Sequence, residues 1–164
     1  MATLKKKILK TEIADFLAVA DDQYLYMLDF ADLPNLDRKL SKIAKGLDIK
    51  SGSNEIIDNV AEEIQLYLTS RLQRFATKTF LVGTDFQKLV WQKLQNIKFG
   101  ETKSYSQIAI EIGNEKASRA VATAIGANPL PVIIPCHRVI ASDGSLAGYS
   151  GGLARKKMLL EIES

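Results

Sequence analysis

A cysteine and a histidine lie side by side at positions 136 and 137, and each is the only residue of its type in the 164-residue chain. A cysteine thiolate is a strong nucleophile, and a nearby basic group makes it available at neutral pH. Imidazole can serve as that base, and a carboxylate behind the ring would orient it. The pair therefore predicts a reactive thiol. Two plainer facts weigh against it: a lone cysteine is most often a small buried hydrophobic residue, and neighbours on an extended segment point to opposite sides, so that a water or a bend would have to connect them.

The chain around this pair is stiff before it and flexible after it. Three prolines between residues 129 and 135 each fix a backbone φ angle and bias the preceding residue away from helix. We therefore expect residues 132–134 to form a buried extended segment, which residues 139–140 continue beyond the pair. The glycine-rich stretch 148–152 follows, and such backbone can approach a ligand closely. This context predicts a thiol in a rigid pocket.

Two helix starts precede this segment, and each is marked by a capping box. Thr84 and Gln87 form the first, from which a helix is expected to run to about Asn96. Ser104 and Gln107 form the second, which begins a short helix. The expected buried face of the first helix consists of Phe86, Leu89, Val90 and Leu94.

A helix-turn-helix pattern follows from the second capping box. The short helix is expected to end at Gly113, and an alanine-rich helix spans residues 116–127. In DNA-binding proteins with this motif the second helix contacts DNA through its N-terminal residues, here around Arg119. Two ordinary core helices with one exposed arginine are the alternative. The small side chains that would let the second helix approach DNA closely are Ala117, Ala120, Ala122 and Ala124.

Residues 1–83 predict a small α/β scaffold domain without a motif that carries chemistry. The boundary to a second domain, residues 84–164, is expected near Gly83. The patterns favour two strands joined by a polar turn, then two helices separated by a loop, then a third strand. The expected elements are strands 16–20 and 24–29, helices 34–47 and 55–70, the loop 48–54 and a strand at 74–82.

The composition fits a cytoplasmic globular protein. Hydrophobic residues make up 46% of the chain, and no apolar run approaches the ~20 residues of a membrane span. No apolar segment follows the basic N-terminus, so we expect no secretory leader. One cysteine cannot form an internal disulfide, which fits a reducing compartment. One cysteine and one histidine cannot close a zinc site, so we expect no metal and no other cofactor.

The net charge of +3 lies entirely in the second half of the chain. Residues 1–84 carry 12 basic and 12 acidic side chains, whereas residues 85–164 carry 10 and 7, a difference of +3. Positive charge beside a reactive thiol favours an anionic partner such as nucleic acid. Chance variation in surface charge would explain the same numbers.

These residues resemble a known family. The stretch from Asn128 to Val139, with Pro-Cys-His-Arg near its end, resembles the active-site signature of the O6-alkylguanine-DNA alkyltransferases, also called methylated-DNA–protein-cysteine methyltransferases. The resemblance is dense over residues 85–163, and over residues 1–84 it is limited to the element order and the segment 20–30. Further landmarks at similar spacings are Phe86, Val90, Trp91, Gly100, Ser104, Tyr105, residues 118–121 and residues 148–152.

The resemblance implies a fold and a reaction. The fold is α/β (α+β), with an N-terminal three-stranded antiparallel sheet and helices, similar to ribonuclease H, and a mostly helical C-terminal domain with a winged-helix or helix-turn-helix motif. The reaction is DNA repair: O6-alkylguanine flips out of double-stranded DNA, and the cysteine takes the alkyl group once and keeps it. O4-alkylthymine is left open as a second substrate. The family likeness also implies a monomer without a cofactor, and leaves cooperative binding along DNA open.

The resemblance also implies catalytic residues. Cys136 would be the acceptor, and His137 would deprotonate it through a water. Glu163 would orient the histidine, with Glu161 as the competing candidate. Asn128 would brace the active-site turn.

A second group would lie at the DNA. Arg119 would fill the gap left by the flipped base, and Tyr105 would crowd the 3′ phosphate and donate to the base. Backbone groups of Cys136 and Val139, together with Ser150, would read the guanine edge. The residues expected at the DNA or the base are Tyr105, Ser118, Arg119, Ala120, Arg138, Val139, Tyr149 and Ser150.

Three other classes of protein compete with this interpretation. A binding-only relative would flag alkylated bases for another pathway, but in such relatives the cysteine is replaced. A thiol hydrolase would turn over repeatedly and would not need Arg119. A transcription regulator would leave the Cys136 pocket unexplained. The chain also departs from the family at Ala122, where many members have glycine.

Overall fold

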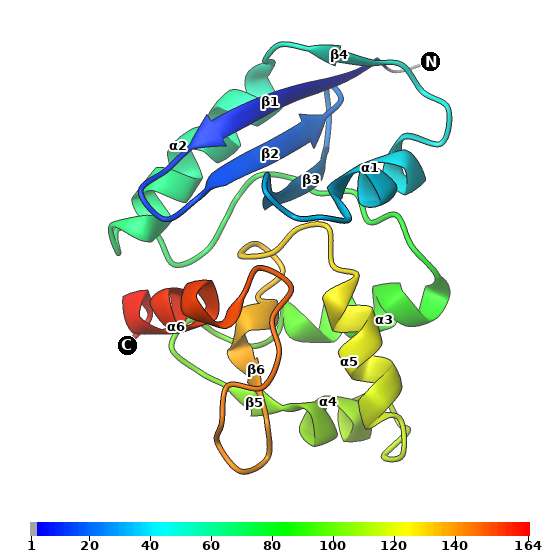
Figure 1. Cartoon of the computed structure of the whole chain (residues 1–164), viewed down its shortest axis with the longest axis vertical. Coiled ribbons are helices and arrows are strands. Elements are labelled where there is room, and N and C mark those ends of the chain that lie inside the picture. The colour runs from blue at the N-terminus through cyan, green and yellow to red at the C-terminus, as the bar shows by residue number, and fades with distance from the viewer. Residues whose placement is uncertain (1–2) are drawn as a thin grey trace. The chain divides into compact units, whose positions relative to one another are not determined.

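The computed structural model describes residues 3–164, and the chain divides between Val82 and Gly83 into two units (Figure 1). The boundary expected from the sequence lies one residue later. Among the residues described, no helix is both long and apolar enough to cross a membrane.

The N-terminal unit is built on a four-stranded sheet in the order β3-β2-β1-β4. β1 and β2 are antiparallel, as are β2 and β3, while β4 runs parallel to β1. The predicted hairpin is confirmed, and its turn is closed by Asp21, whose Oδ1 accepts from the amides of Gln23 and Tyr24 at 2.8 and 2.7 Å. The strands are β1 (Leu4–Lys10), β2 (Asp15–Ala20), β3 (Leu25–Phe30) and β4 (Ile49–Ser51).

The prediction of a three-stranded, wholly antiparallel sheet with its third strand at 74–82 is wrong. That segment makes only an isolated bridge, in which Leu25 donates to Lys78 and accepts from Phe80 at 2.8 and 2.9 Å. β1 was not predicted, because consecutive lysines at 5–7 interrupt the alternation of apolar residues. β4 lies in the predicted loop 48–54, and its three residues are too few to show a period.

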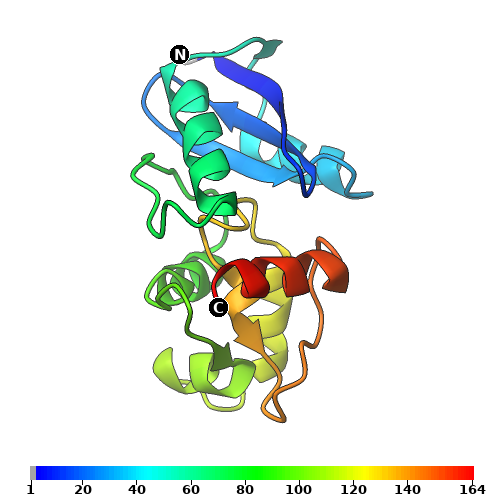
Figure 2. The same ribbon diagram turned by 90° about the vertical axis from the view of Figure 1, so that its left-hand side faces the viewer.

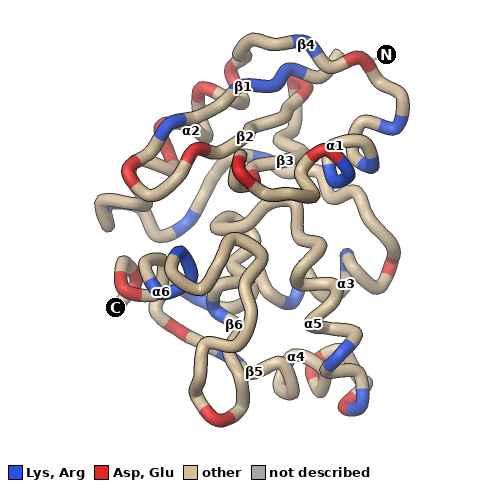
Figure 3. The backbone as a smooth tube through the Cα atoms, viewed as in Figure 1, with Lys and Arg blue, Asp and Glu red and all other residues tan. Residues whose placement is uncertain are grey.

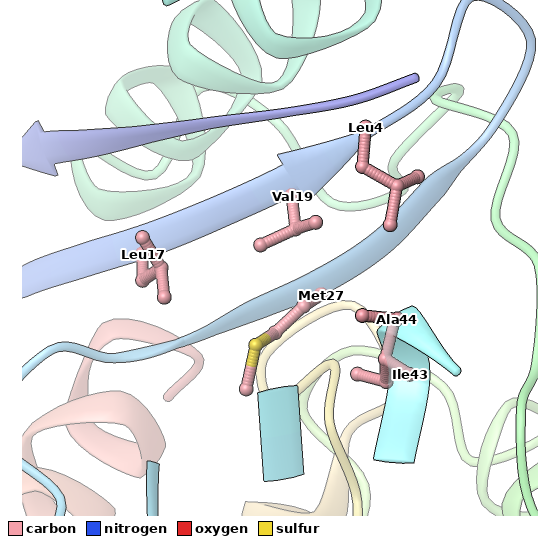
Figure 4. Close-up of a cluster of buried hydrophobic side chains, with 6 residues drawn as sticks. All are labelled: Leu4, Leu17, Val19, Met27, Ile43 and Ala44. Atoms are coloured by element: carbon pink, nitrogen blue, oxygen red, sulfur yellow. The ribbon is translucent and has the colours of Figure 1, made fainter. Parts of the chain in front are cut away.

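Two helices, α1 (Leu36–Ala44) and α2 (Glu55–Leu68), cover opposite faces of this sheet (Figures 1 and 2). Asn54 caps α2 by accepting from the amide of Ile57 at 2.9 Å. In Figure 4, side chains from the sheet point toward α1 and form a buried apolar cluster. The cluster consists of Leu4, Leu17, Val19, Met27, Ile43 and Ala44.

The C-terminal unit is mostly helical. Both predicted capping boxes are confirmed, at Thr84 with Gln87 and at Ser104 with Gln107. Lysine and arginine residues lie at the turn between the second and third helices of this unit and along its last helix. Aspartate or glutamate residues lie near both groups (Figure 3). The elements are α3 (Asp85–Leu94), β5 (Lys103–Ser104), α4 (Tyr105–Glu111), α5 (Ser118–Gly126), a 3-10 turn η1 (Cys136–Arg138), β6 (Val139–Ile140) and α6 (Leu153–Ile162). β5 and β6 pair in parallel.

Trp91 fixes α3 against α5. Its ring is 1% exposed, and Nε1 donates to the carbonyl of Ala124 at 2.9 Å. The prediction that Leu89 is buried was wrong, since Leu89 is 39% exposed. The buried residues of α3 are instead Val90, Trp91 and Leu94. Trp91 is among them because burial of its large indole ring is favourable and its N–H finds a hydrogen-bond partner there.

We expect Gly83→Ala to destabilise the C-terminal unit. An added Cβ would lie 2.8 Å from the Trp91 ring and 2.7 Å from Oε1 of Gln87. Such overpacking costs about 1–3 kcal/mol of unfolding free energy. Chemical denaturation measures this loss, and Gly126→Ala is the matched control because a Cβ there meets nothing within 4 Å. Equal stability of the two variants would contradict this account of Trp91 packing.

Candidate active site around Cys136

Asn128 braces the turn that leads to the cysteine. Its side chain is 1% exposed, and Nδ2 donates to the carbonyl of Ile134 at 3.0 Å. Its Oδ1 accepts from the amide of Leu130 at 2.9 Å. One amide side chain thus joins both ends of the segment between residues 130 and 134.

This segment is a tight turn, and the prediction that residues 132–134 are extended was wrong. The amide of Ile134 donates back to the carbonyl of Leu130 at 2.8 Å. Val132 has a φ of 76°, which is unusual and strained for a β-branched residue. The prolines fix their own φ angles but leave this bend to Val132, so proline content alone did not predict the direction of the chain.

The cysteine and histidine lie on the 3-10 turn η1 instead of an extended strand. The amide of Cys136 donates to the carbonyl of Ile134 at 2.7 Å, and that of Arg138 donates to Pro135 at 3.0 Å. Cys136 is 2% exposed and His137 is fully buried. The bend that a cysteine–histidine relay requires is therefore present.

Glu163 closes the far side of the histidine. Nε2 of His137 donates to Oε2 of Glu163 at 2.6 Å, and both side chains are buried. The competing Glu161 is exposed and makes no such contact. Because Nε2 donates its hydrogen to the carboxylate, the acceptor lone pair of the neutral ring is on Nδ1.

The environment keeps His137 neutral. Burial lowers the pKa of His137 below its ordinary value of 6.5; the hydrogen bond and charge of Glu163 oppose this shift, and the charges of Arg138 and Lys156 reinforce it. The imidazole is therefore unprotonated at pH 7, as a general base must be.

Arg138, which the sequence analysis expects among the DNA contacts, is buried and binds Glu163. Its Nε and Nη2 donate to the two carboxylate oxygens of Glu163 at 2.8 and 2.9 Å, and Nη1 donates to the carbonyl of Ile97 at 2.7 Å. The guanidinium carbon lies 5.9 Å from the ring centroid of Phe99. Arg138 is 6% exposed, because the bidentate pair satisfies a carboxylate that is itself buried.

Sequence reasoning missed Lys156, which is fully buried. Its Nζ donates to the carbonyls of Val139 at 2.6 Å, Gly148 at 3.1 Å and Leu146. Burial lowers the pKa of Lys156 to about 8, and the charge on Cys136 opposes the shift. The signal lay in helical spacing: Lys156 and Leu159 of α6 share one face with Glu163, the C-cap of that helix, and Leu159 is buried.

The residues expected at the DNA divide between an exposed helix face and the rim of the cysteine site. On α5, Arg119 and Ala120 are exposed and Ser118 is half-buried. Ala122 is also exposed, whereas Ala117 and Ala124 face the core, so only half of the predicted alanine set can contact a partner.

Tyr105 begins α4 and is half-buried. Burial raises the pKa of Tyr105 above its ordinary value of 10.0, and the charge on Cys136 adds to the rise. Its hydroxyl is therefore protonated at neutral pH and within electrostatic reach of the sulfur. Beyond β6, Tyr149 is half-buried and Ser150 is exposed, in the loop that Lys156 contacts.

A cleft of about 730 Å³ lies elsewhere, within the N-terminal unit. Its lining includes Tyr24, Glu55, Glu63 and Lys78, and none of the residues expected at the active site or at the DNA. Across residues 3–164, no group of three or more histidine, cysteine, aspartate or glutamate side chains could ligate a metal ion.

Comparison with known proteins places this geometry in a family. Residues 85–164 match the model of the 6-O-methylguanine DNA methyltransferase DNA-binding domain. The chain is 38% identical over 159 residues to a methylated-DNA–protein-cysteine methyltransferase of Methanosarcina barkeri, covering 95% of this chain and 94% of that protein.

Two solved structures are similar over nearly the whole chain. The crystal structure of Mycobacterium tuberculosis OGT in complex with DNA matches with a TM-score of 0.83 and 34% identity, covering 98% of this chain and 92% of that one. The O6-methylguanine-DNA methyltransferase of Pyrococcus kodakaraensis matches with a TM-score of 0.74 and 26% identity, covering 99% of each chain. The chain belongs to the methylated-DNA–protein-cysteine methyltransferase family.

Proposed function

We propose that this protein repairs DNA by a one-use transfer of an alkyl group from O6 of alkylguanine in duplex DNA to Sγ of Cys136. The observation that carries the proposal is the buried relay beside the only cysteine, in which Glu163 binds Nε2 of His137 at 2.6 Å. A family whose name specifies a protein cysteine as methyl acceptor needs such a relay to form a thiolate.

The chemical step follows from the orientation of the ring. Nδ1 of His137 takes the proton of the Cys136 thiol through a water molecule, while Glu163 stabilises the imidazolium. The thiolate attacks the alkyl carbon, the C–S bond forms as the C–O bond breaks, and the electron pair stays on the guanine. The guanine then takes a proton from the hydroxyl of Tyr105, and the imidazolium of His137 returns a proton to Tyr105 through solvent. The thioether is stable, so each molecule reacts once and no cofactor is required.

Access to the base requires that it leave the duplex. The exposed face of α5, with Arg119, Ala120 and Ala122, supports a minor-groove contact by the second helix of a helix-turn-helix pair. Arg119 would occupy the space that the base vacates and so offset part of the few kcal/mol that flipping costs. Ser118, Tyr149, Ser150 and the backbone of Val139 would complete the contacts to DNA and base.

The protein acts as a monomer on DNA, with cooperative binding left open, in the reducing cytoplasm that keeps a thiol available. The N-terminal unit would be ribonuclease H-like and would serve as a scaffold.

The test is the intact-protein mass after incubation with a duplex that carries one O6-methylguanine, beside the same duplex with guanine. We expect one methyl group per protein in a single burst, mapped by peptide digestion to Cys136, and none in Cys136→Ala. Binding without any change of mass would make the protein a lesion binder. Repeated turnover with an unmodified cysteine would make it a hydrolase.

Arg119→Ala tests the flipping step in the same assay. We expect slower transfer from duplex DNA, and a smaller deficit when the lesion lies in single-stranded DNA, where no base pair must open. Lys116→Ala removes one positive charge just before α5 and is the control for electrostatics alone. Equal losses for the two variants on both substrates would contradict the proposed role of Arg119.

A further inference from the structure

Lys156 and Glu163 both contact residues 137–139, which directly follow Cys136. Lys156 lies in α6 and Glu163 is its C-cap, two turns later on the same face, with Leu159 between them, and all three are buried. Glu163 contacts His137 and Arg138 of η1, while Lys156 contacts the strand that follows that turn. One helix face therefore supports both sides of the cysteine site.

The ammonium joins two stretches of backbone that are separate in sequence. An ammonium has three donors, and Nζ meets three carbonyls. One carbonyl belongs to Val139, directly after η1, and the other two belong to Leu146 and Gly148, directly before Tyr149 and Ser150. The contacts fix the loop that carries these two residues against the cysteine turn.

The burial of a charged group at this position needs a physical explanation. A buried ammonium costs free energy unless it is both hydrogen-bonded and paired with an opposite charge. Carbonyl dipoles satisfy its donors but carry no net charge. Cys136 lies within electrostatic reach, and its thiolate form favours protonated Lys156. By reciprocity, the ammonium favours the thiolate.

Resting on the alkyl-transfer function proposed above, we propose that Lys156 is a positioning residue for that reaction. It holds the 146–150 loop at the base and supplies the countercharge for the Cys136 thiolate before attack. Alkylation turns the thiolate into a neutral thioether and removes this countercharge. The Lys156 ammonium then loses its anionic partner, and the loop it anchors loosens in the spent protein.

The first test measures thiolate formation. Because the chain has one cysteine, thiolate absorbance near 240 nm, after subtraction of the Cys136→Ala titration, reports Cys136 at pH values below those at which the tyrosines ionise. We expect Lys156→Met to move the thiolate transition upward by about one pH unit, and Lys156→Arg to move it less. His137 titrates nearby and feels Lys156 as well, so the same titration in a His137→Gln background isolates the cysteine. Lys157→Met, at an exposed neighbouring lysine, is the matched control.

The second test measures single-turnover transfer at saturating O6-methylguanine duplex at pH 7, where Lys156 with a pKa of about 8 is protonated, and each rate constant is divided by the thiolate fraction from the first test. We expect Lys156→Met to lower the maximum rate constant about 10²-fold with little change in the apparent Kd for DNA, since the loop misplaces the base and not the duplex. Lys156→Arg keeps the charge but not the three-carbonyl geometry, so its rate should fall while its titration stays close to wild type.

The outcomes distinguish a failure of the proposed function from a failure of the proposed role of Lys156. If wild type never gains a methyl group, the proposed function fails. If wild type reacts and a folded Lys156→Met matches it in both titration and rate, the role of Lys156 is overturned and the function stands. Should Lys156→Met not fold, a wild-type maximum rate in Lys156→Arg overturns the anchoring.

The third test addresses the spent protein. Hydrogen exchange of residues 146–150 should accelerate after methylation in wild type but not in Lys156→Met, where the anchor is already lost. Unchanged exchange in methylated wild type would overturn the countercharge.

Discussion

Glu163→Gln is expected to slow methyl transfer to Cys136 by about 10²–10⁴-fold, the range that a positioned general base contributes. The carboxylate accepts from Nε2 of His137 at 2.6 Å, which leaves Nδ1 as the base and stabilises the imidazolium that forms. An amide can present its NH₂ to the ring instead and so favour the wrong tautomer. It also leaves the guanidinium of Arg138 without its bidentate partner.

Single-turnover mass spectrometry on the O6-methylguanine duplex measures this effect, at a temperature well below the unfolding transition of each variant. Glu161→Gln is the matched control, because Glu161 lies two residues away on α6 and is exposed. It should react like wild type. A Glu163→Gln rate within a few-fold of wild type would mean that His137 acts without an oriented carboxylate.

Arg138→Met is expected to reduce the free energy of unfolding by about 3–5 kcal/mol, as when one partner of a buried ion pair is removed. The guanidinium makes two hydrogen bonds to Glu163 and one to the carbonyl of Ile97, all with buried partners. Methionine fills the space but leaves a buried carboxylate shared with a neutral imidazole. Denaturant titration measures the loss, and Lys157→Met controls for removal of an exposed cation in the same unit.

The same variant should change the pH dependence of transfer. The charge of Arg138 helps to lower the pKa of His137, so its removal raises that pKa and protonates more of the ring at pH 7. Transfer by Arg138→Met should therefore recover as the pH rises and more of the base becomes neutral, relative to wild type. A parallel pH profile in the two proteins would show that Arg138 acts on stability alone.

Local signals in the sequence identified most helices and the chemical centre. The capping boxes at Thr84 and Ser104 depend on residues three apart, so they form wherever the helix forms. The adjacency of the only cysteine and histidine marked the reactive turn, and the resemblance selected Glu163 over Glu161. The helices of the second half were therefore largely predictable, whereas the turn at residues 130–134, the 3-10 turn η1 and the exposure of Leu89 were not.

Non-local pairing was not predictable in the same way. β1 and β4 are recognisable only as partners of each other and of β2, because lysines mask one and the other has three residues. The bend at Val132 depends on Asn128, whose side chain joins two backbone groups across the turn. Neither the spacing of apolar residues nor the number of prolines contains information about such contacts.

The sequence by itself determined where the thiol, the neighbouring imidazole and the helix proposed to contact DNA lie along the chain, because composition, caps and motif spacing are local properties. The tertiary structure alone decided what the charged residues around them do. Arg138 and Lys156 have the side chains of surface residues, yet both are buried. The orientation of each side chain is set by the partners that it meets in the folded chain. Arg138 binds a carboxylate 25 residues away in sequence, and Lys156 binds three carbonyls. Burial of a charge is favourable only where such partners meet it, and only the folded chain brings them together.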